Sequence, residues 1–238
     1  MKLKGQRVVI IGGSSGIGLA IAKMAVSEGA LVVIASRSLV KLEKAAAEIR
    51  GEVEVLTVDI REENSVKQFF DDVGEFDHLT TPGGEVTGGH FLHLDLQEAR
   101  KAFDSKFWGQ YQAAKYGAPK IRSGGSITLF SGANSQRPLP QSSVRAAINS
   151  AVEGLARALA TELSPIRVNA ISPGPVDTPL HDHLPKERRE ALFRAIAASL
   201  PLKRIGKPEE IAQTVLYLMT NGFTTGSTLF VDGGYTLR

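Results

Sequence analysis

Two polar side chains share one face of a predicted helix. In the stretch SSVRAAINSAVEGL, residues 142–155, Arg145 and Asn149 are four residues apart. Residues at that spacing point to the same side of an α-helix. A guanidinium stays protonated at any working pH, so Arg145 cannot give up a proton. It can stabilise negative charge that develops on a substrate, or it can form a surface or interface ion pair.

A turn of small residues follows the first apolar run of the chain. The segment VVIIGGSSGIGLAIA predicts a strand, a tight turn and a helix. Such a turn lets the backbone approach a pyrophosphate, whose charge the helix N-terminus stabilises. Because a strand precedes the motif and a helix follows it, we predict a dinucleotide site rather than a plain turn. The residues assigned to this site are Gly12, Ser14, Ser15, Gly16, Ile17 and Gly18.

The second predicted strand ends in IASRS, with Ser36, Arg37 and Ser38. A protein that selects the unphosphorylated dinucleotide usually carries Asp or Glu at this point, for the ribose hydroxyls. A guanidinium flanked by hydroxyls suits a 2′-phosphate instead. We therefore predict that the cofactor is NADP(H), the alternative being a surface arginine without a ligand.

Alternating strands and helices must position these residues. Strands separated by helical crossovers indicate an α/β fold, with a parallel sheet covered on both faces. No repeat or linker-like composition divides the chain, so we expect one domain over residues 1–238. The strand candidates are 7–11, 31–36, 53–58, 78–81, 126–130, 167–171 and 227–231, and the helix candidates are 16–28, 39–50, 63–73, 95–118, 144–163 and 208–219.

Residues 172–206 interrupt this alternation, with loops and an extra helix between the last two strands. An insertion at the carboxyl end of a parallel strand is where a lid over a substrate would lie. We predict a lid-like segment at about 175–206.

Composition narrows the classes of function. The 238 residues are 42% hydrophobic, enough for one substantial core. The net charge is only +3 and the basic residues are spread along the chain, so we expect no nucleic-acid partner. Cysteine is absent, which excludes disulfides and thiolate metal sites. No run approaches the about 20 apolar residues of a membrane span. We expect a cytoplasmic protein with a small-molecule substrate and no membrane association.

The motifs together resemble those of the short-chain dehydrogenase/reductase family over nearly the whole chain. They are GGSSGIG at 12–18, VDI at 58–60, RVNAISPGPVDTP at 167–179 and TGSTLFVDGGY at 225–235. The resemblance implies a Rossmann-type, doubly wound parallel sheet of seven strands in a single domain. It also implies that Asp59 and Ile60 flank the adenine. The nicotinamide end would be held by Pro173, Gly174, Val176 and Thr178.

Assembly is implied by the same resemblance. Family members usually pair through the helices that correspond to 95–118 and 144–163 and through the last strand. We therefore expect a homo-oligomer, either a tetramer or a dimer.

The resemblance breaks at the catalytic positions. The family uses a serine after the fifth strand, a tyrosine and a lysine four residues apart, and an asparagine from the preceding helix. An alignment without gaps places Arg145 at the tyrosine, Asn149 at the lysine and Lys106 at the asparagine. Gly132 falls at the serine, with Ser131 one residue early. The candidate catalytic residues are therefore Lys106, Arg145, Asn149 and Ser131, and the family mechanism is not transferred to them.

Lys106 is the residue among these that could donate a proton. If it lies beside Arg145 in a partly buried pocket, desolvation and like charge both lower its pKa toward neutrality; otherwise it is a solvated helix lysine. His90 and His93, in the loop after the fourth strand, could shuttle a proton or simply be solvated. The stretch LHDHL at 180–184 lacks a fourth ligand, so we expect no metal site.

Three functions remain open from the sequence. The first is an NADP(H)-dependent oxidoreductase with a non-standard active site that reduces a small carbonyl, imine or quinone-like substrate. The second is a catalytically silent NADP(H)-binding sensor or partner subunit. The third, a cofactor-independent lyase, leaves GGSSGIG and Arg37 without a purpose. The motif PGPVDTP and the lid-like insertion favour the enzyme.

Overall fold

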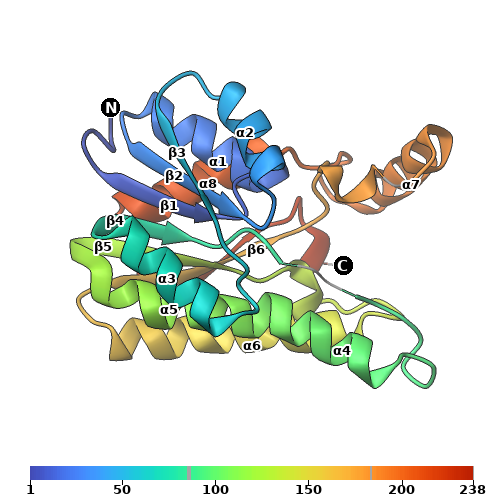
Figure 1. Cartoon of the computed structure of the whole chain (residues 1–238). Coiled ribbons are helices and arrows are strands. Elements are labelled where there is room, and N and C mark those ends of the chain that lie inside the picture. Colours follow the sequence, from blue (N-terminus) through green and yellow to red (C-terminus); the bar gives the residue numbers. More distant parts are fainter. Residues whose placement is uncertain (85–86, 183, 238) are drawn as a thin grey trace.

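A parallel sheet forms the centre of the molecule (Figure 1). The structure is a computed structural model that describes residues 1–84, 87–182 and 184–237. Within these residues seven parallel strands form one sheet, in the order β3-β2-β1-β4-β5-β6-β7. The predicted Rossmann-type fold is confirmed. The strands are β1 (Arg7–Ile11), β2 (Leu31–Ser36), β3 (Val53–Thr57), β4 (Phe76–Thr80), β5 (Ile121–Phe130), β6 (Arg167–Pro173) and β7 (Thr228–Val231).

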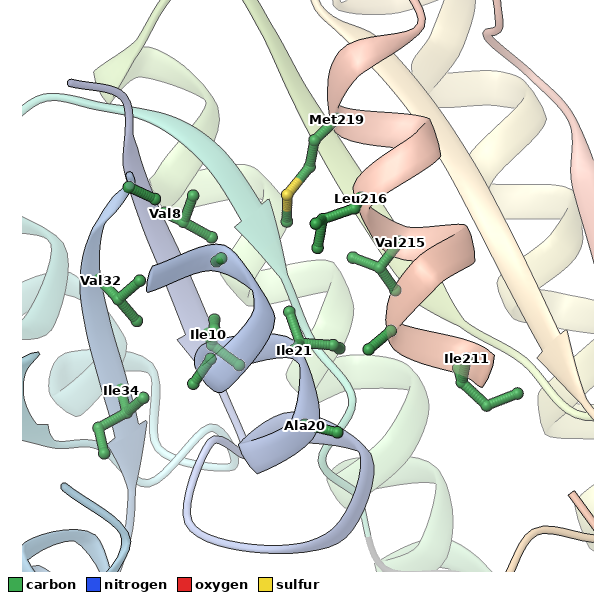
Figure 2. Packing of buried hydrophobic residues seen from close by; sticks show 14 of the residues in the cluster. Val8, Ile10, Ala20, Ile21, Val32, Ile34, Ile211, Val215, Leu216 and Met219 are labelled. Atoms are coloured by element: carbon green, nitrogen blue, oxygen red, sulfur yellow. The ribbon is translucent and has the colours of Figure 1, made fainter. Parts of the chain in front are cut away.

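Helices cover both faces of the sheet, as Figure 1 shows. One face is covered by α1 (Gly16–Ser27), α2 (Leu39–Ala47) and α8 (Pro208–Thr220). The other is covered by α3 (Glu63–Val73), α4 (Leu96–Phe103), α5 (Gly109–Gly117) and α6 (Ser143–Glu162). Successive strand residues point to opposite faces, so each face has its own apolar core. In β1, Val8 and Ile10 pack toward α1 and α8, as Figure 2 shows, whereas Val9 and Ile11 pack toward the other face.

The helix predicted at 95–118 is interrupted. A π-helical turn, Asp104–Trp108, separates α4 from α5, and a 3₁₀ turn at Ala118–Lys120 follows α5. The turn is stabilised by a side chain, because Gln110 Nε2 donates a hydrogen bond of 2.8 Å to the carbonyl oxygen of Lys106. Single π-turns inside α-helices are often found at functional sites. The interruption therefore marks the segment that carries Lys106.

The segment between β6 and α8 holds the extra helix expected there. A 3₁₀ turn at Pro179–His181 leads to α7 (Lys186–Ser199), none of whose residues is buried. Figure 1 shows α7 extending away from the sheet. Over the described ranges, no helix is both long and apolar enough to span a bilayer.

A buried histidine lies inside the sheet, at the middle of β4. His78 Nδ1 is 2.9 Å from Ser126 Oγ, and Nε2 is 3.0 Å from Gln6 Oε1. The amide oxygen of Gln6 only accepts hydrogen bonds, so Nε2 carries the proton and Nδ1 accepts from Ser126. Burial, with a smaller contribution from Arg167, lowers the pKa of His78 to about 4. The neutral ring satisfies both partners and is the folded form at neutral pH.

We predict that His78 makes the fold less stable in acid. An unfolded histidine titrates near 6.5, so below that pH only the unfolded chain binds the proton. This contribution is complete above pH 6.5 and is lost as the pH falls toward 4, with a slope of up to about 1.4 kcal/mol per pH unit. Urea unfolding of His78→Gln at several pH values should show a flatter dependence than that of the wild type. The exposed His93→Gln should keep the wild-type slope; equal slopes for all three proteins would contradict this assignment.

Candidate functional site

The turn after β1 leaves room for an anion at the N-terminus of α1. Gly12 and Gly16 have φ values of +104° and +51°, which favour glycine. A Cβ on Gly12 would lie 2.5 Å from the amide nitrogen of Gly83, and one on Gly18 would collide with the carbonyl oxygen of Gly12. No side chain of the described residues caps α1, and its first turn has no acidic residue. The first N–H groups of the helix, beside Ser14, Ser15 and Ile17, therefore suit a pyrophosphate.

The residues predicted to hold the adenosine end lie at the same edge of the sheet. Ser36 ends β2 beside Thr57 of β3, and Ser38 caps α2 by accepting the amide of Lys41 at 3.4 Å. Hydrogen bonds from Arg61 hold the pKa of Asp59 below its usual value, and the charge of Arg37 contributes.

Ile60 lies on the side of this edge that faces α5. A Cβ on Gly109 would lie 2.6 Å from Cδ1 of Ile60. Arg37, Asp59 and Ile60 are thus gathered where β2 and β3 end, which is the placement that an adenosine 2′-phosphate site needs.

The motif after β6 meets the glycine turn. Pro173 ends β6, and Gly174 is so close to Asp232 that a Cβ on it would lie 2.6 Å from the Asp232 Cα. Val176 forms an isolated bridge with Gly206. A Cβ on Gly16 would lie 3.5 Å from Cβ of Thr178, so the turn and this motif are neighbours. The predicted cofactor residues thus lie along one edge of the sheet, and their backbone fits a dinucleotide.

Lys106 projects from the π-turn toward α6. Its Nζ donates hydrogen bonds to Asn149 Oδ1 at 2.8 Å and to the carbonyl oxygen of Ser131 at 3.0 Å. The residue as a whole keeps some exposure, but its ammonium is enclosed. Burial, and then the charge of Arg145, lower the pKa of Lys106 to about 8. An ammonium with that pKa is mostly protonated at neutral pH and can release its proton.

Arg145 lies in the first turn of α6, against the loop that follows β4. Its guanidinium occupies the space that a Cβ on Gly88 would need, and the carbonyl oxygen of Gln141 borders the same point. Nε is buried without a hydrogen-bond partner, and over the described ranges Arg145 has no ion-pair partner. Its charge acts on both Lys106 and Tyr235. The sequence left open whether Lys106 lies beside Arg145 or is solvated; in the structure the Lys106 ammonium is enclosed and the charge of Arg145 acts on it.

Ser131 contributes its backbone rather than its hydroxyl. Oγ donates to Glu153 Oε1 at 2.7 Å and to the carbonyl oxygen of Asn149 at 3.1 Å. Both acceptors lie on α6, whereas the carbonyl oxygen of Ser131 faces Lys106. Gly132, at the aligned serine position, lies against Asn149. A Cβ on Gly132 would lie 2.9 Å from Nδ2 of Asn149. Of the four candidate catalytic residues, Ser131 is therefore the one whose side chain is directed away.

The sequence analysis missed two buried polar residues whose hydrogen bonds position Lys106 and Ser131. Gln110, fully buried, receives hydrogen bonds from Thr81 Oγ1 and from the amide of Phe130, both at 2.7 Å, and donates to the Lys106 and Phe130 carbonyls. Glu153 accepts from Ser131, from Ser135 at 2.5 Å and from Gln136 at 3.3 Å. Their only sequence signal is a polar residue on an otherwise apolar helix face.

Tyr235 and Arg137 were also missed. The guanidinium of Arg137 lies 4.9 Å from the Tyr235 ring centroid and donates to the Tyr235 carbonyl at 2.9 Å. Burial raises the pKa of the Tyr235 hydroxyl, and Arg137 and Arg145 oppose that rise. This contact ties the last segment of the chain to the connection between β5 and α6.

The histidines named from the sequence lie outside this network. His90 and His93 are exposed, and their ring centroids are 5.0 Å apart. His183, in the LHDHL stretch, lies outside the described residues. In the part of the chain that the structure describes, no group of three or more His, Cys, Asp or Glu side chains could hold a metal ion.

Comparison with known proteins places the chain among oxidoreductases. The model of a family described as enoyl-(acyl carrier protein) reductase matches residues 12–236. The short-chain dehydrogenase/reductase ATR9 of Stachybotrys chlorohalonatus is 36% identical, over 99% of both chains.

Solved structures agree in fold over the same length. A small-chain dehydrogenase in complex with NADPH is 36% identical, with a TM-score of 0.87 over 99% of this chain and 100% of that one. The MalC reductase/Diels-Alderase from Malbranchea aurantiaca is 30% identical, with a TM-score of 0.92 over 100% of this chain and 98% of that one. The chain therefore belongs to the short-chain dehydrogenase/reductase family.

Proposed function

We propose that this protein is an NADP(H)-dependent oxidoreductase that reduces a small carbonyl, imine or quinone-like substrate with Lys106 as its proton donor. The observation that carries the proposal is the position of the Lys106 ammonium, enclosed between Asn149 and Ser131 with a pKa of about 8. The serine, tyrosine and lysine of the family pattern are replaced at Gly132, Arg145 and Asn149.

The glycine turn and the ends of β2, β3 and β6 would hold the cofactor. The N-terminus of α1 binds the pyrophosphate, and Arg37 with Ser36 and Ser38 binds the 2′-phosphate. NADPH, when bound, supplies a hydride to the substrate carbon. A neighbour of similar fold was solved in complex with NADPH, which supports the choice of cofactor.

The residues of this chain handle the charge and the proton. Lys106 gives a proton from Nζ to the substrate oxygen, while Asn149 and the Ser131 carbonyl hold the ammonium in place. Arg145 stabilises negative charge without transferring a proton. Solvent then reprotonates Lys106.

The exchange of lysine and asparagine favours an enzyme over a silent binder. Relative to the family pattern, Lys106 stands at the asparagine position and Asn149 at the lysine position, and the two side chains are hydrogen bonded at 2.8 Å. Loss of function alone gives no reason for two reciprocal changes. An ammonium held by an asparagine is retained, with one partner on α6 and the other in the segment after β5.

We also propose a cytoplasmic homo-oligomer, a dimer or tetramer, formed through α4, α5, α6 and β7. Support comes from exposed apolar side chains on the first two of these helices and the turn between them, namely Leu96, Trp108 and Tyr111. Residues at about 175–206, with α7 unburied, are proposed as a lid.

The function is tested by NADPH oxidation against ketones, quinones, imines and activated alkenes, alongside direct titration with NADPH. We expect tight NADPH binding and turnover on at least one class. Tight binding with no turnover on any class would instead identify a sensor or partner subunit. An absence of affinity for NADPH and NADP⁺ would contradict both the oxidoreductase and the sensor or partner subunit.

Replacement of Lys106 by methionine should remove the proton donor. We expect ketone reduction to fall by about 10²- to 10⁴-fold in kcat, the usual contribution of general acid catalysis. The dissociation constant of NADPH should stay within about twofold, because Lys106 acts on substrate oxygen. The control is Lys101→Met, which removes an exposed lysine paired with Glu98 on α4. Equal rates for wild type and Lys106→Met would leave water as the proton source.

The pH dependence should report the same group. Reduction needs the ammonium, so kcat should be level below a midpoint near pH 8 and fall above it. Arg145→Gln removes a positive charge that lowers the pKa of Lys106, so the midpoint should move to higher pH. The measurement is kcat at saturating substrate from about pH 6 to about pH 10. A midpoint that is unchanged in Arg145→Gln would contradict the coupling.

Arg37 should set the preference for the phosphorylated cofactor. Charge-assisted hydrogen bonds contribute about 1.5–3 kcal/mol, so Arg37→Ala should weaken NADPH binding by about 10- to 100-fold. NADH lacks the 2′-phosphate and its affinity should change little. Arg50→Ala, at an exposed position after α2, is the matched control. If NADPH and NADH lose affinity equally, Arg37 does not bind the 2′-phosphate.

A further inference from the structure

Among the described residues, Arg145 is a cation without a counter-ion, next to the loop that follows β4. Within the described residues it forms no ion pair and no hydrogen bond, and its Nε is buried without a partner. Its guanidinium faces Gly88 of the loop after β4, and its charge is felt at the Lys106 ammonium. The guanidinium of Arg145 therefore has N–H groups that no described residue accepts and that a ligand could bind.

The charges around Arg145 are mostly positive. Lys106 and Arg137 are cations nearby, and the buried carboxylate of Glu153 is fully engaged by Ser131, Ser135 and Gln136. Tyr235 keeps its proton, because burial raises the pKa of its hydroxyl.

Asp232, a half-buried carboxylate at this end of the sheet, accepts hydrogen bonds from the amides of Gly234 and Thr236 and from the Thr236 hydroxyl. Asp104, His90 and His93 are exposed. Glu85, in the loop between Gly84 and Gly88, lies outside the described residues. Among the described groups, positive charge therefore exceeds negative charge around Arg145.

We propose that Arg145 binds a planar anionic group of the substrate, a carboxylate or an ionised enol or phenol, next to the carbonyl that is reduced. The planar fork of a guanidinium matches such groups with two parallel hydrogen bonds. The inference rests on the proposed function and narrows its substrate class. A cationic iminium, by contrast, is repelled by both Lys106 and Arg145.

The two cations would then have separate roles. Arg145 holds the anionic group, which the reaction leaves unchanged. Bound NADPH would supply the hydride for the carbonyl carbon. As the C=O π-bond becomes an oxygen lone pair, that oxygen takes the proton of Lys106. The products are an alcohol that still carries its anionic group, NADP⁺ and a neutral lysine.

Anion binding should also change the protonation of Lys106. Arg145 contributes to the lowered pKa of Lys106, and a bound anion neutralises that contribution. Near pH 8, where Lys106 is partly deprotonated, binding should therefore take up a fraction of a proton. A binder that acts only through hydrophobic contact causes no such uptake.

The test uses calorimetric titration of the full-length protein loaded with NADPH. The probes are benzoate and its uncharged analogue benzamide. Neither contains a ketone or aldehyde that the enzyme could reduce. A second pair is 2-hydroxy-1,4-naphthoquinone, an anion at this pH, and uncharged 1,4-naphthoquinone, each titrated with NADP⁺ in place of NADPH so that no reduction occurs. The pairs distinguish a carboxylate from an ionised enol as the group recognised.

We expect at least one anion to bind about 10- to 100-fold tighter than its neutral analogue, in the range of charge-assisted hydrogen bonds. Arg145→Gln should abolish this preference, and Arg157→Gln, an exposed arginine on the same helix, should keep it. Lys106→Met should keep the preference but lose the proton uptake seen in two buffers of different ionisation enthalpy.

Equal affinities for charged and uncharged probes in wild type would overturn the inference, as would a preference that survives in Arg145→Gln. Because the probes are not turned over, either result leaves NADPH-dependent reduction of neutral ketones as a separate question. The proposed function and the anion site can therefore fail independently.

Discussion

The ammonium of Lys106 is held in place by oxygen atoms from two other parts of the chain. Asn149 on α6 and the carbonyl of Ser131 after β5 accept its protons, and the π-turn at Asp104–Trp108 aims the side chain at them. That turn depends on Gln110, whose amide bridges the Lys106 carbonyl and the ends of β4 and β5. The position of the proposed proton donor therefore depends on contacts with the sheet.

Charge balance explains why this arrangement can act near neutral pH. Enclosure and Arg145 both disfavour the ammonium, while two acceptors favour it, and the result is a pKa near 8. Arg145 cannot donate a proton, so its role is electrostatic. The carboxylate of Glu153 accepts hydrogen bonds from Ser131, Ser135 and Gln136. In the proposed function, proton transfer and anion stabilisation thus belong to different side chains.

Local patterns were sufficient to predict the sheet and the glycine turn after β1. The β-branched runs and the glycine turn act over a few residues, so the strands and the Gly12–Gly18 turn follow from the sequence. The π-turn could not be predicted, because it depends on the contact of Gln110 with strands distant in sequence. The direction of the Ser131 hydroxyl, set by Glu153, is likewise a tertiary effect. Strand β5 also begins five residues earlier than predicted, since Ile121 pairs with Phe76 across a polar, glycine-containing stretch.

Carbon-13 NMR of the lysine side chains, with Lys106 assigned from its methionine variant, tests the central claim most directly. A proton donor tuned by enclosure and by Arg145 should titrate near pH 8 in the wild type and at higher pH in Arg145→Gln. A Lys106 resonance that titrates at the ordinary lysine value of 10.5 in both proteins would contradict the account.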